Sequence, residues 1–280
     1  MTRPVMITVA PNGARKLRKD HPALPISPFE LGTTAASSFD AGASMLHLHV
    51  RDKNQKHSLD PDLYCLATKE IRLQAGSELI VQITTESVGK YRPEEQIECV
   101  RRSRPEAVSL ALREIIPNDQ YEAAAARFFT WLQTEKIAPQ WILYDQEDIQ
   151  RFRNYCARGL IPDEIIHVLI VLGRHHKTNH SNPNELEGLV TLLNQNWHWS
   201  ACAFGEEEAK CMARAIKLNG HCRVGFENNL YLADGQEAQS NTDLVLSTAE
   251  AIRSSGNSVA SCDAVRNLFG IFLGRRYLPF

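Results

Sequence analysis

Two histidines separated by one residue, His47 and His49, have the types and spacing best suited to chemistry in this chain. They lie in an apolar, strand-like run, where residues i and i+2 point to the same face, so Leu46 and Leu48 point to the other. Two imidazoles on one rigid strand can hold a divalent metal such as zinc. A third ligand from elsewhere would complete a catalytic site with one open position. By spacing alone, a pair of hydrogen-bonded core histidines explains the pattern equally well.

Length and composition restrict the class of protein. The 280 residues can form one large α/β domain or two ordinary ones. Charged residues make up 23% and hydrophobic residues 43% of the chain, which is typical of a folded protein. A net charge of -2 argues against nucleic acid as the main partner. No apolar run is long enough to span a membrane, and residues 1–6 do not resemble a signal peptide, so we expect a cytoplasmic protein.

The cysteines favour a reducing compartment. They are odd in number, widely spaced and without a Cys-x-x-Cys pair: Cys65, Cys99, Cys156, Cys202, Cys211, Cys222 and Cys262. Free cysteines are usually packing residues. A catalytic cysteine stays open for Cys202 and Cys222, because both lie in strand-like segments.

Short β-rich runs alternate with longer helical patterns along the chain. The runs are rich in Val, Ile, Leu or aromatic residues and predict eight strands: Val5–Ala10, Ser44–Val50, Glu78–Thr84, Ala107–Leu112, Gln140–Tyr144, Ile165–Gly173, His198–Gly205 and His221–Phe226. In the seventh, alternation predicts that Trp197 and Trp199 pack outward against helices and that His198 faces inward.

Helix starts are marked by capping residues. Ser27, Pro28 and Glu30 form a capping box with proline at the first helical position, and Asp60 precedes Pro61 in the same way. Further helices are predicted at Leu63–Leu73, Tyr121–Leu132, Glu206–Leu218, Leu244–Ser254 (opened by Asn241-Thr242-Asp243) and Asp263–Phe272.

Eight strands, each followed by a helix, predict a single (β/α)8 TIM barrel of the α/β class over residues 1–280. A doubly wound sheet is the second choice, because neither a Gly-x-Gly-x-x-Gly nor a phosphate-binding loop motif is present. Active sites of such barrels lie where the strands end. His47 and His49 end the second strand and Glu227 follows the eighth, and strands eight, one and two are neighbours in a closed barrel. Glu227 is therefore the predicted third ligand.

Two long motifs resemble the β-keto acid cleavage enzymes, of which the 3-keto-5-aminohexanoate cleavage enzyme is the best-known type. They are His47-Leu48-His49-Val50-Arg51-Asp52 with Ser58-Leu59-Asp60, and Gly220-His221-Cys222-Arg223-Val224-Gly225-Phe226-Glu227-Asn228-Asn229. The similarity extends from residues 7–14 through 82–85 to 239–241. It implies a zinc-dependent TIM barrel that converts a β-keto acid and acetyl-CoA to acetoacetate and a new acyl-CoA. It also implies a homo-oligomer, a tetramer by resemblance.

The resemblance assigns roles to individual residues. His47, His49 and Glu227 would bind Zn²⁺, which as a Lewis acid stabilises the charge that develops on the keto oxygen. Arg223 would pair with a carboxylate or an oxyanion, although a structural ion pair with Glu227 is an alternative. The candidate substrate-binding residues lie on or after strands one, three and four: Asn12, Arg15, Thr84, Thr85 and Ser109.

Two departures from the family concern the substrate. Members acting on amino acids carry Thr-Gly-Ala-Glu after the first strand, where this chain has Asn12-Gly13-Ala14-Arg15. An acid expected on the fifth strand is replaced by Ile142. Because arginine repels an ammonium group and attracts a carboxylate, we expect an anionic or neutral substrate, for example a β-keto dicarboxylic acid. Alternatively, Arg15 belongs to a solvated basic run, 15–19, that could attract the phosphates of CoA.

Other departures concern catalysis. Asn228 replaces an aspartate beside the metal-binding glutamate, and an amide cannot act as a general base. Glu86 is a candidate substitute, or it narrows the pocket. The loop after strand six also differs from the family and contains His175, His176 and His180. These histidines could form a second metal site or an acid–base group, or belong to a solvated segment.

These changes leave three functions open. The first is the family reaction. The second is a zinc-dependent hydrolase or aldolase-type lyase that does not use CoA, suggested by the changed loop after strand six and by Glu206–Glu208 after strand seven. The third is a catalytically silent relative that binds a small acid, suggested by Asn228.

Overall fold

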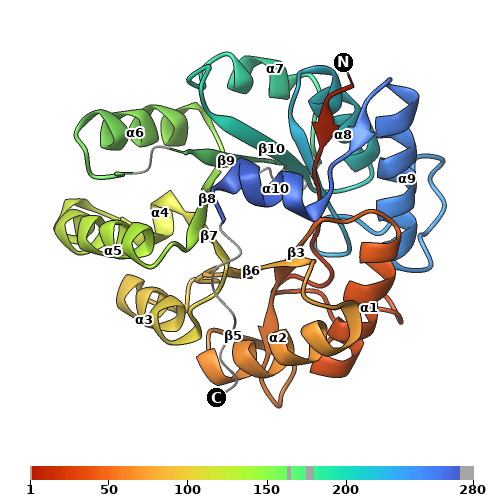
Figure 1. Cartoon of the computed structure of the whole chain (residues 1–280), viewed down its shortest axis with the longest axis horizontal. Coiled ribbons are helices and arrows are strands. Elements are labelled where there is room, and N and C mark those ends of the chain that lie inside the picture. Colours follow the sequence, from red (N-terminus) through yellow and green to blue (C-terminus); the bar gives the residue numbers. More distant parts are fainter. Residues whose placement is uncertain (1, 163–164, 175–179, 272–280) are drawn as a thin grey trace.

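A closed barrel of eight parallel strands forms the centre of the molecule (Figure 1). The computed structural model describes residues 2–162, 165–174 and 180–271. In barrel order, with the last strand paired to the first, the strands are β2 (Ile7–Val9), β3 (Met45–Leu48), β6 (Ile80–Thr84), β7 (Ala107–Ala111), β8 (Ala138–Leu143), β9 (His167–Leu172), β10 (His198–Ala203) and β11 (His221–Val224). The predicted TIM barrel is confirmed.

All eight predicted strands are present, each with slightly different ends, and the first is divided. β1 (Pro4–Val5) leaves the barrel to pair with β12 (Ser258–Val259). Between β1 and β2, the backbone N–H of Met6 donates to Nδ1 of His221 at 3.0 Å, so a side chain takes the place of a strand partner there. After β3, the strands β4 (Val50–Arg51) and β5 (His57–Ser58) form an antiparallel hairpin that the sequence did not predict.

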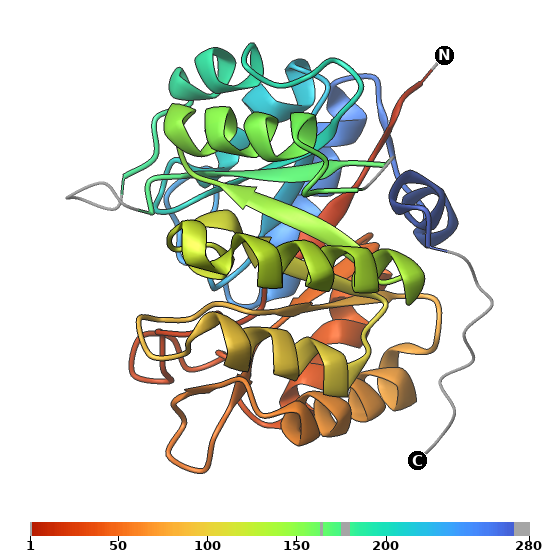
Figure 2. The same cartoon turned by 90° about the vertical axis from the view of Figure 1, so that its left-hand side faces the viewer.

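Helices surround the barrel in both views (Figures 1 and 2). They are α1 (Pro28–Asp40), α2 (Pro61–Ala75), α3 (Pro93–Ser103), α4 (Leu112–Ile115), α5 (Glu122–Thr134, after a 3-10 turn at Asp119–Tyr121), α6 (Gln146–Ala157), α7 (Glu185–Val190), α8 (Glu208–Lys217), α9 (Asn241–Ser254) and α10 (Cys262–Phe269). The predicted caps are confirmed: Ser27 and Glu30 form a reciprocal capping box, and the Asp60 carboxylate accepts from the N–H of Asp62.

Strand alternation separates an apolar outer face from a more polar barrel interior. Leu46 and Leu48 of β3, for example, belong to the large core between barrel and helices. Trp199 lies in that core, and the ring of Trp197 meets Phe152 of α6 edge-on at 5.0 Å, so the outward packing of both tryptophans is confirmed. His198 alternates with Trp199 and is exposed at the N-terminal end of the barrel.

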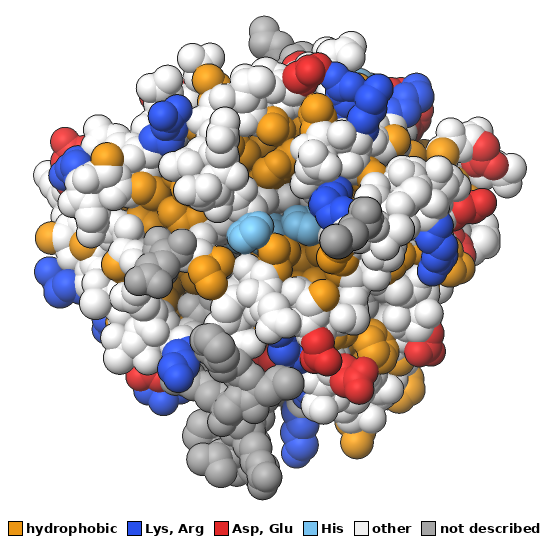
Figure 3. All heavy atoms as spheres, turned by 45° about the horizontal axis from the view of Figure 1, so that its top comes forward, with side chains coloured by type: hydrophobic (Ala, Val, Ile, Leu, Met, Phe, Trp, Pro, Cys, Tyr) orange, Lys and Arg blue, Asp and Glu red, His pale blue; other side chains and the backbone are white. Residues whose placement is uncertain are grey.

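Helix α10 covers the N-terminal end of the barrel, and Figure 2 shows it outside the ring of strands. Val265 and Phe269 pack against Met6, which lies directly before β2, and Met45, the first residue of β3. The Phe269 ring stacks on His167 with centroids 4.2 Å apart. Figure 3, turned by 45° from the view of Figure 1, shows histidine side chains near the centre of the visible face and most charged side chains toward its edge. A closed N-terminal end leaves the C-terminal end for a site.

Within the described parts of the chain, no helix combines the length and apolar character needed to cross a membrane.

Candidate active site

His47 and His49 face the interior at the C-terminal end of the barrel. His47 lies on β3 and His49 directly after it, and both are almost fully buried. Their Nε2 atoms are 3.1 Å apart. The i, i+2 spacing therefore brings two imidazole nitrogens to one point, as the sequence predicted.

Glu227 reaches the same point from the turn after β11. Its Oε2 lies 3.3 Å from Nε2 of His49 and 3.6 Å from Nε2 of His47. The turn is held by the backbone N–H of Glu227, which donates to the carbonyl of Ala10 after β2 at 3.0 Å. Because β11, β2 and β3 are consecutive in the barrel, Glu227 comes within 3.3 Å of His49 although the two are far apart in sequence.

The three side chains fit a zinc ion. Zinc takes nitrogen and oxygen ligands at about 2.0 to 2.1 Å, and tetrahedral geometry then places ligand atoms about 3.3 to 3.4 Å apart. The observed separations of the three atoms are 3.1, 3.3 and 3.6 Å. Among the described residues, this is the group of His, Cys, Asp and Glu side chains with ligand atoms close enough to share a metal.

Electrostatics keep these three candidate ligands in protonation states that could bind a metal. Burial and the nearby Arg223 guanidinium hold the pKa of His47 well below its ordinary value, so the imidazole is neutral. Burial by itself raises the pKa of Glu227, but the Arg223 guanidinium, with a hydrogen bond from His49, outweighs it and holds that pKa well below its ordinary value. Nη2 of Arg223 donates to Oε1 of Glu227 at 2.5 Å, which leaves Oε2 facing the histidines.

The loop after β2 packs against Glu227. Gly13 has a φ of +58°, and a Cβ there would lie 2.5 Å from Cγ of Glu227. Arg51 of β4 holds this loop by donating to the carbonyls of Gly13 and Lys16, at 2.7 and 2.8 Å. Lys16 in turn donates to the backbone carbonyl of Glu227 at 2.8 Å. The motif residue Arg51 thus has a structural role that the sequence did not suggest.

A pocket opens from the three candidate ligands toward the C-terminal end of the barrel. Its free space is about 400 Å³, including the part open to solvent. It is lined by a polar side and an apolar side, made up of His47, His49, Thr84, Thr85, Glu86, Ser109, Glu114, Arg174, Arg223 and Glu227, and of Ala111, Ile142, Tyr144, Val171 and Phe204. Both sides are contributed by residues at or just after the ends of strands, as the fold predicts.

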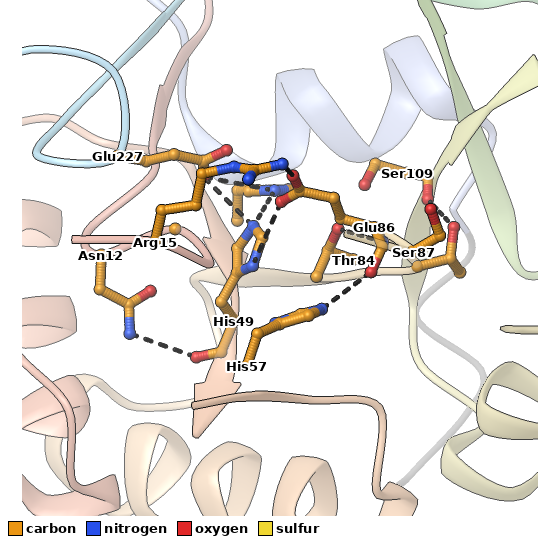
Figure 4. A network of polar contacts seen from close by, with 12 residues as sticks. Asn12, Arg15, His49, His57, Thr84, Glu86, Ser87, Ser109 and Glu227 are labelled. Atoms are coloured by element: carbon orange, nitrogen blue, oxygen red, sulfur yellow. Dashed lines mark hydrogen bonds and ion pairs between the residues drawn. The ribbon is translucent and has the colours of Figure 1, made fainter. Parts of the chain in front are cut away.

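Glu86 occupies the mouth of this pocket between two guanidinium groups. Its Oε1 accepts from Nη2 of Arg174 at 2.6 Å and lies 3.6 Å from Nη2 of Arg15. Its Oε2 lies 4.0 Å from Nδ1 of His49 (Figure 4). Glu86 therefore points toward the ligands and carries charge-compensating partners on its outer side.

The other predicted substrate-binding residues divide into two groups. Thr84, Thr85 and Ser109 line the pocket, where Oγ1 of Thr84 also accepts from the N–H of Glu86 at 3.0 Å. Asn12 does not line it, because its amide nitrogen donates to the carbonyls of Pro25 and His49 at 2.9 and 3.3 Å (Figure 4 shows the second bond). Asn12 thus supports the loop and strand that carry the ligands.

Asn228 is buried beside Glu227 but does not line the pocket. Cys202 and Cys222 are fully buried, and burial raises the pKa of their thiols to about 11 and about 12. Such thiols are packing residues rather than nucleophiles. Of the three loop histidines, His180 is exposed, and His175 and His176 lie outside the described residues.

Sequence reasoning did not single out Arg174, Glu114 and Tyr144, which also line the pocket. Arg174 stacks over the Phe204 ring, with its guanidinium carbon 4.9 Å from the ring centroid. Burial raises the pKa of Glu114, and its Oε2 accepts from the N–H of Ser87 at 2.9 Å. All three follow the ends of β7, β8 or β9, so the strand-end rule alone was the available signal.

Comparison with known proteins identifies the family of this chain. Residues 4–271 match the sequence pattern of the beta-keto acid cleavage enzyme family. The chain belongs to that family. It is therefore an acyl-transferring enzyme that cleaves β-keto acids, and the motifs around His47 and Glu227 are the ones that first indicated it.

Relatives within this family are distant but match over nearly their full length. The 3-oxoadipate:acetyl-CoA acetyltransferase of Cupriavidus necator is 29% identical, over 97% of this chain and 96% of that protein. The 3-keto-5-aminohexanoate cleavage enzyme of Acetoanaerobium sticklandii is 27% identical, over 95% and 98%. The apo structure of ObcA superposes with a TM-score of 0.73 and 17% identity, over 89% of this beta-keto acid cleavage enzyme and 66% of that chain, and supports the fold.

Proposed function

We propose that this chain is a zinc-dependent β-keto acid cleavage enzyme that takes acetyl-CoA and a β-keto acid with a second anionic group. In the exchange, the C2–C3 bond of the β-keto acid breaks and its acyl group passes to the CoA sulfur. The two-carbon carboxymethyl fragment joins the acetyl group as acetoacetate. The observation that carries the proposal is the convergence of His47, His49 and Glu227 at the head of a pocket lined by Glu86, a carboxylate that Arg174 and Arg15 both approach.

The ligand cluster is suited to the keto oxygen of a β-keto acid. Zinc held there supplies a Lewis acid for the developing oxyanion. Arg223 is buried against the cluster and lines the pocket, where its planar fork is suited to a carboxylate or an oxyanion. Its Nη2 is bonded to Glu227, so Arg223 both orients a ligand and presents positive charge to the substrate.

Glu86 is the proposed general base. The family reaction requires removal of a proton from the carbon between the ketone and the carboxylate, and Asn228 is an amide outside the pocket lining. Glu86 lines the pocket with Oε2 on the side of His49, and its Oε1 is held by Arg174. The ion pair fixes the carboxylate while leaving one oxygen directed inward.

The mouth of the pocket supports an anionic substrate. Arg174 and Arg15 both approach Glu86, so two positive charges face one negative charge there. Ile142 lines the pocket at the position where an acid would meet an amino group. The 3-oxoadipate of the Cupriavidus relative's name is a β-keto dicarboxylic acid, which fits this charge pattern.

The experiment is a panel of three β-keto acids tested with acetyl-CoA: 3-oxoadipate, a neutral β-keto acid of similar length and 3-keto-5-aminohexanoate. We expect acetoacetate from all active substrates and a kcat/KM for 3-oxoadipate at least 10-fold above the neutral acid. A preference for the amino-bearing acid would contradict the assignment of Arg15 and Arg174.

The two alternative functions give different results in the same assay. Turnover of a β-keto acid without acetyl-CoA would support a zinc-dependent hydrolase or lyase. Tight binding without turnover, with activity appearing in Asn228→Asp, would support a silent acid-binding relative. Metal analysis tests the shared premise, since purified protein with less than about half a zinc per chain, not recovered on adding metal, contradicts all three.

A further inference from the structure

A chain of side-chain hydrogen bonds crosses the barrel interior behind the ligand cluster. Nδ1 of His47 lies 2.7 Å from Oε1 of Gln82 on β6. Nε2 of Gln82 donates to Oε1 of Gln140 on β8 at 3.0 Å. All three side chains are almost fully buried, so the chain is shielded from solvent.

The hydrogen bonds from His47 through Gln82 to Gln140 determine which nitrogen of His47 carries the proton. The amide nitrogen of Gln82 is engaged with Gln140, so the atom that Gln82 presents to His47 is its carbonyl oxygen, which can only accept. Nδ1 of His47 must then carry a hydrogen. The neutral ring therefore has its lone pair on Nε2, the nitrogen directed at His49 and Glu227.

The burial of Gln82 and Gln140 in the barrel interior carries a free-energy cost. Burying an amide is unfavourable unless its polar atoms are paired. Nε2 of Gln140 has no hydrogen-bond partner among the described residues, so the pair is not fully compensated. The residue paired with Gln140 on β7 is Ser109, whose side chain has no carbonyl oxygen.

We propose that Gln82, oriented by Gln140, is a positioning residue that fixes the tautomer and the ring direction of His47 for metal binding. This rests on the zinc part of the proposed function. Groups behind metal-bound histidines commonly have this role, and their loss typically costs 10- to 100-fold in metal affinity. In this chain an amide takes the place of the more usual carboxylate or backbone carbonyl.

The test measures zinc affinity and coordination in four variants. Gln82→Leu removes the acceptor, and we expect zinc affinity to fall about 10- to 100-fold, read by chelator competition on metal-free protein. Gln82→Glu keeps an acceptor for Nδ1–H, and Gln140 can turn its amide to donate to it. We expect this variant to bind zinc at least 10-fold more tightly than Gln82→Leu.

Gln140→Leu leaves the acceptor on Gln82 but allows the Gln82 amide to rotate, so we expect a loss of zinc affinity smaller than that of Gln82→Leu. The matched control is Gln96→Leu, which replaces an equally buried glutamine on α3 whose amide contacts backbone carbonyls and no histidine. It should change the melting temperature but not the zinc affinity. Cobalt-substituted protein gives a second readout, because the visible d–d bands should change in Gln82→Leu and stay unchanged in Gln96→Leu.

The failures can be told apart. If wild-type protein binds neither zinc nor cobalt, the metal part of the proposed function is wrong. If wild-type protein binds zinc and Gln82→Leu binds it equally well with the same cobalt spectrum, the positioning role alone is wrong. Equal losses in Gln82→Leu and Gln82→Glu would also overturn it, because a lost acceptor could not then be the cause.

Discussion

Glu227 can reach the two histidines because residue 13 has no side chain. A Cβ on Gly13 would lie 2.5 Å from Cγ and 3.0 Å from Cβ of Glu227, closer than side chains approach each other. The left-handed backbone at this position also favours glycine. A motif residue that carries no functional group thus determines where a functional carboxylate lies.

We expect Gly13→Ala to lower zinc affinity by at least 10-fold, because the added methyl group displaces Glu227 from the ligand cluster. Zinc competition with a chelator measures this. The control is Gly235→Ala, which also places alanine at a positive φ, +84°, but meets nothing within 4 Å. Equal zinc affinity in both variants would show that Glu227 does not depend on Gly13.

Substrate charge is tested at Arg174. Because hydrogen bonds to charged groups contribute about 1.5 to 3 kcal/mol, we expect Arg174→Gln to lower kcat/KM for 3-oxoadipate by about 10- to 100-fold relative to the neutral acid. Arg15→Gln should have a smaller effect, because the Arg15 side chain is 62% exposed and lies 3.6 Å from Glu86. Equal losses for both substrates in Arg174→Gln would point to a role on Glu86 alone.

At the scale of elements, α10 closes the end of the barrel that the site does not use. Phe269 is buried against His167 and the apolar ring of Met6, Met45 and Ile80. This packing stabilises the strands whose opposite ends carry the ligands, while lying at the far end of the barrel from them. Stability and chemistry are therefore divided between the two ends of the same strands.

Phe269→Ala should reduce the free energy of unfolding by about 3 kcal/mol, because a buried aromatic ring is lost and a cavity remains. Urea unfolding of metal-free protein measures the loss. Zinc affinity at neutral pH should stay within about twofold of wild type. A large drop in affinity would mean that α10 and the ligand cluster are coupled through the strands.

At the scale of the whole molecule, buried histidines make stability depend on pH. Burial lowers the pKa of His221 to about 3, with Arg3 and His198 contributing, and burial lowers that of His57 to about 3. In the unfolded chain each histidine takes up a proton below about pH 6.5. The unfolded state then binds more protons than the folded state, so stability is present above about pH 6.5 and is lost as pH falls toward 3.

We expect His221→Asn to make this loss less steep. The Asn oxygen can still accept from the N–H of Met6, but it does not titrate, so the slope between pH 6 and 4 should fall by up to about 1.4 kcal/mol per pH unit. Urea unfolding of metal-free protein at pH 7.5, 6, 5 and 4 measures it. An unchanged slope would show that His221 is protonated in the folded state.

The sequence determined the order of the eight barrel strands and the helices between them, because alternation and capping residues are local signals. The capping box at Ser27 and Glu30 is an example, formed by residues three positions apart. The pair His47 and His49 is another, since a strand directs both side chains to one face without help from the rest of the fold. Eight predicted strands implied a closed barrel, and closure placed Glu227, after the eighth strand, close to the two histidines on the second.

Only the tertiary structure decided what surrounds these ligands. The partners of Glu86, the hydrogen bonds from His47 through Gln82 to Gln140, and the contact of Gly13 with Glu227 join residues on separate strands and loops. Such contacts depend on side-chain direction and on sub-ångström packing between elements, which no local pattern encodes. For the same reason Asn12, Arg15 and Asn228 were predicted at the site, while the folded chain places the side chains of all three outside the pocket lining.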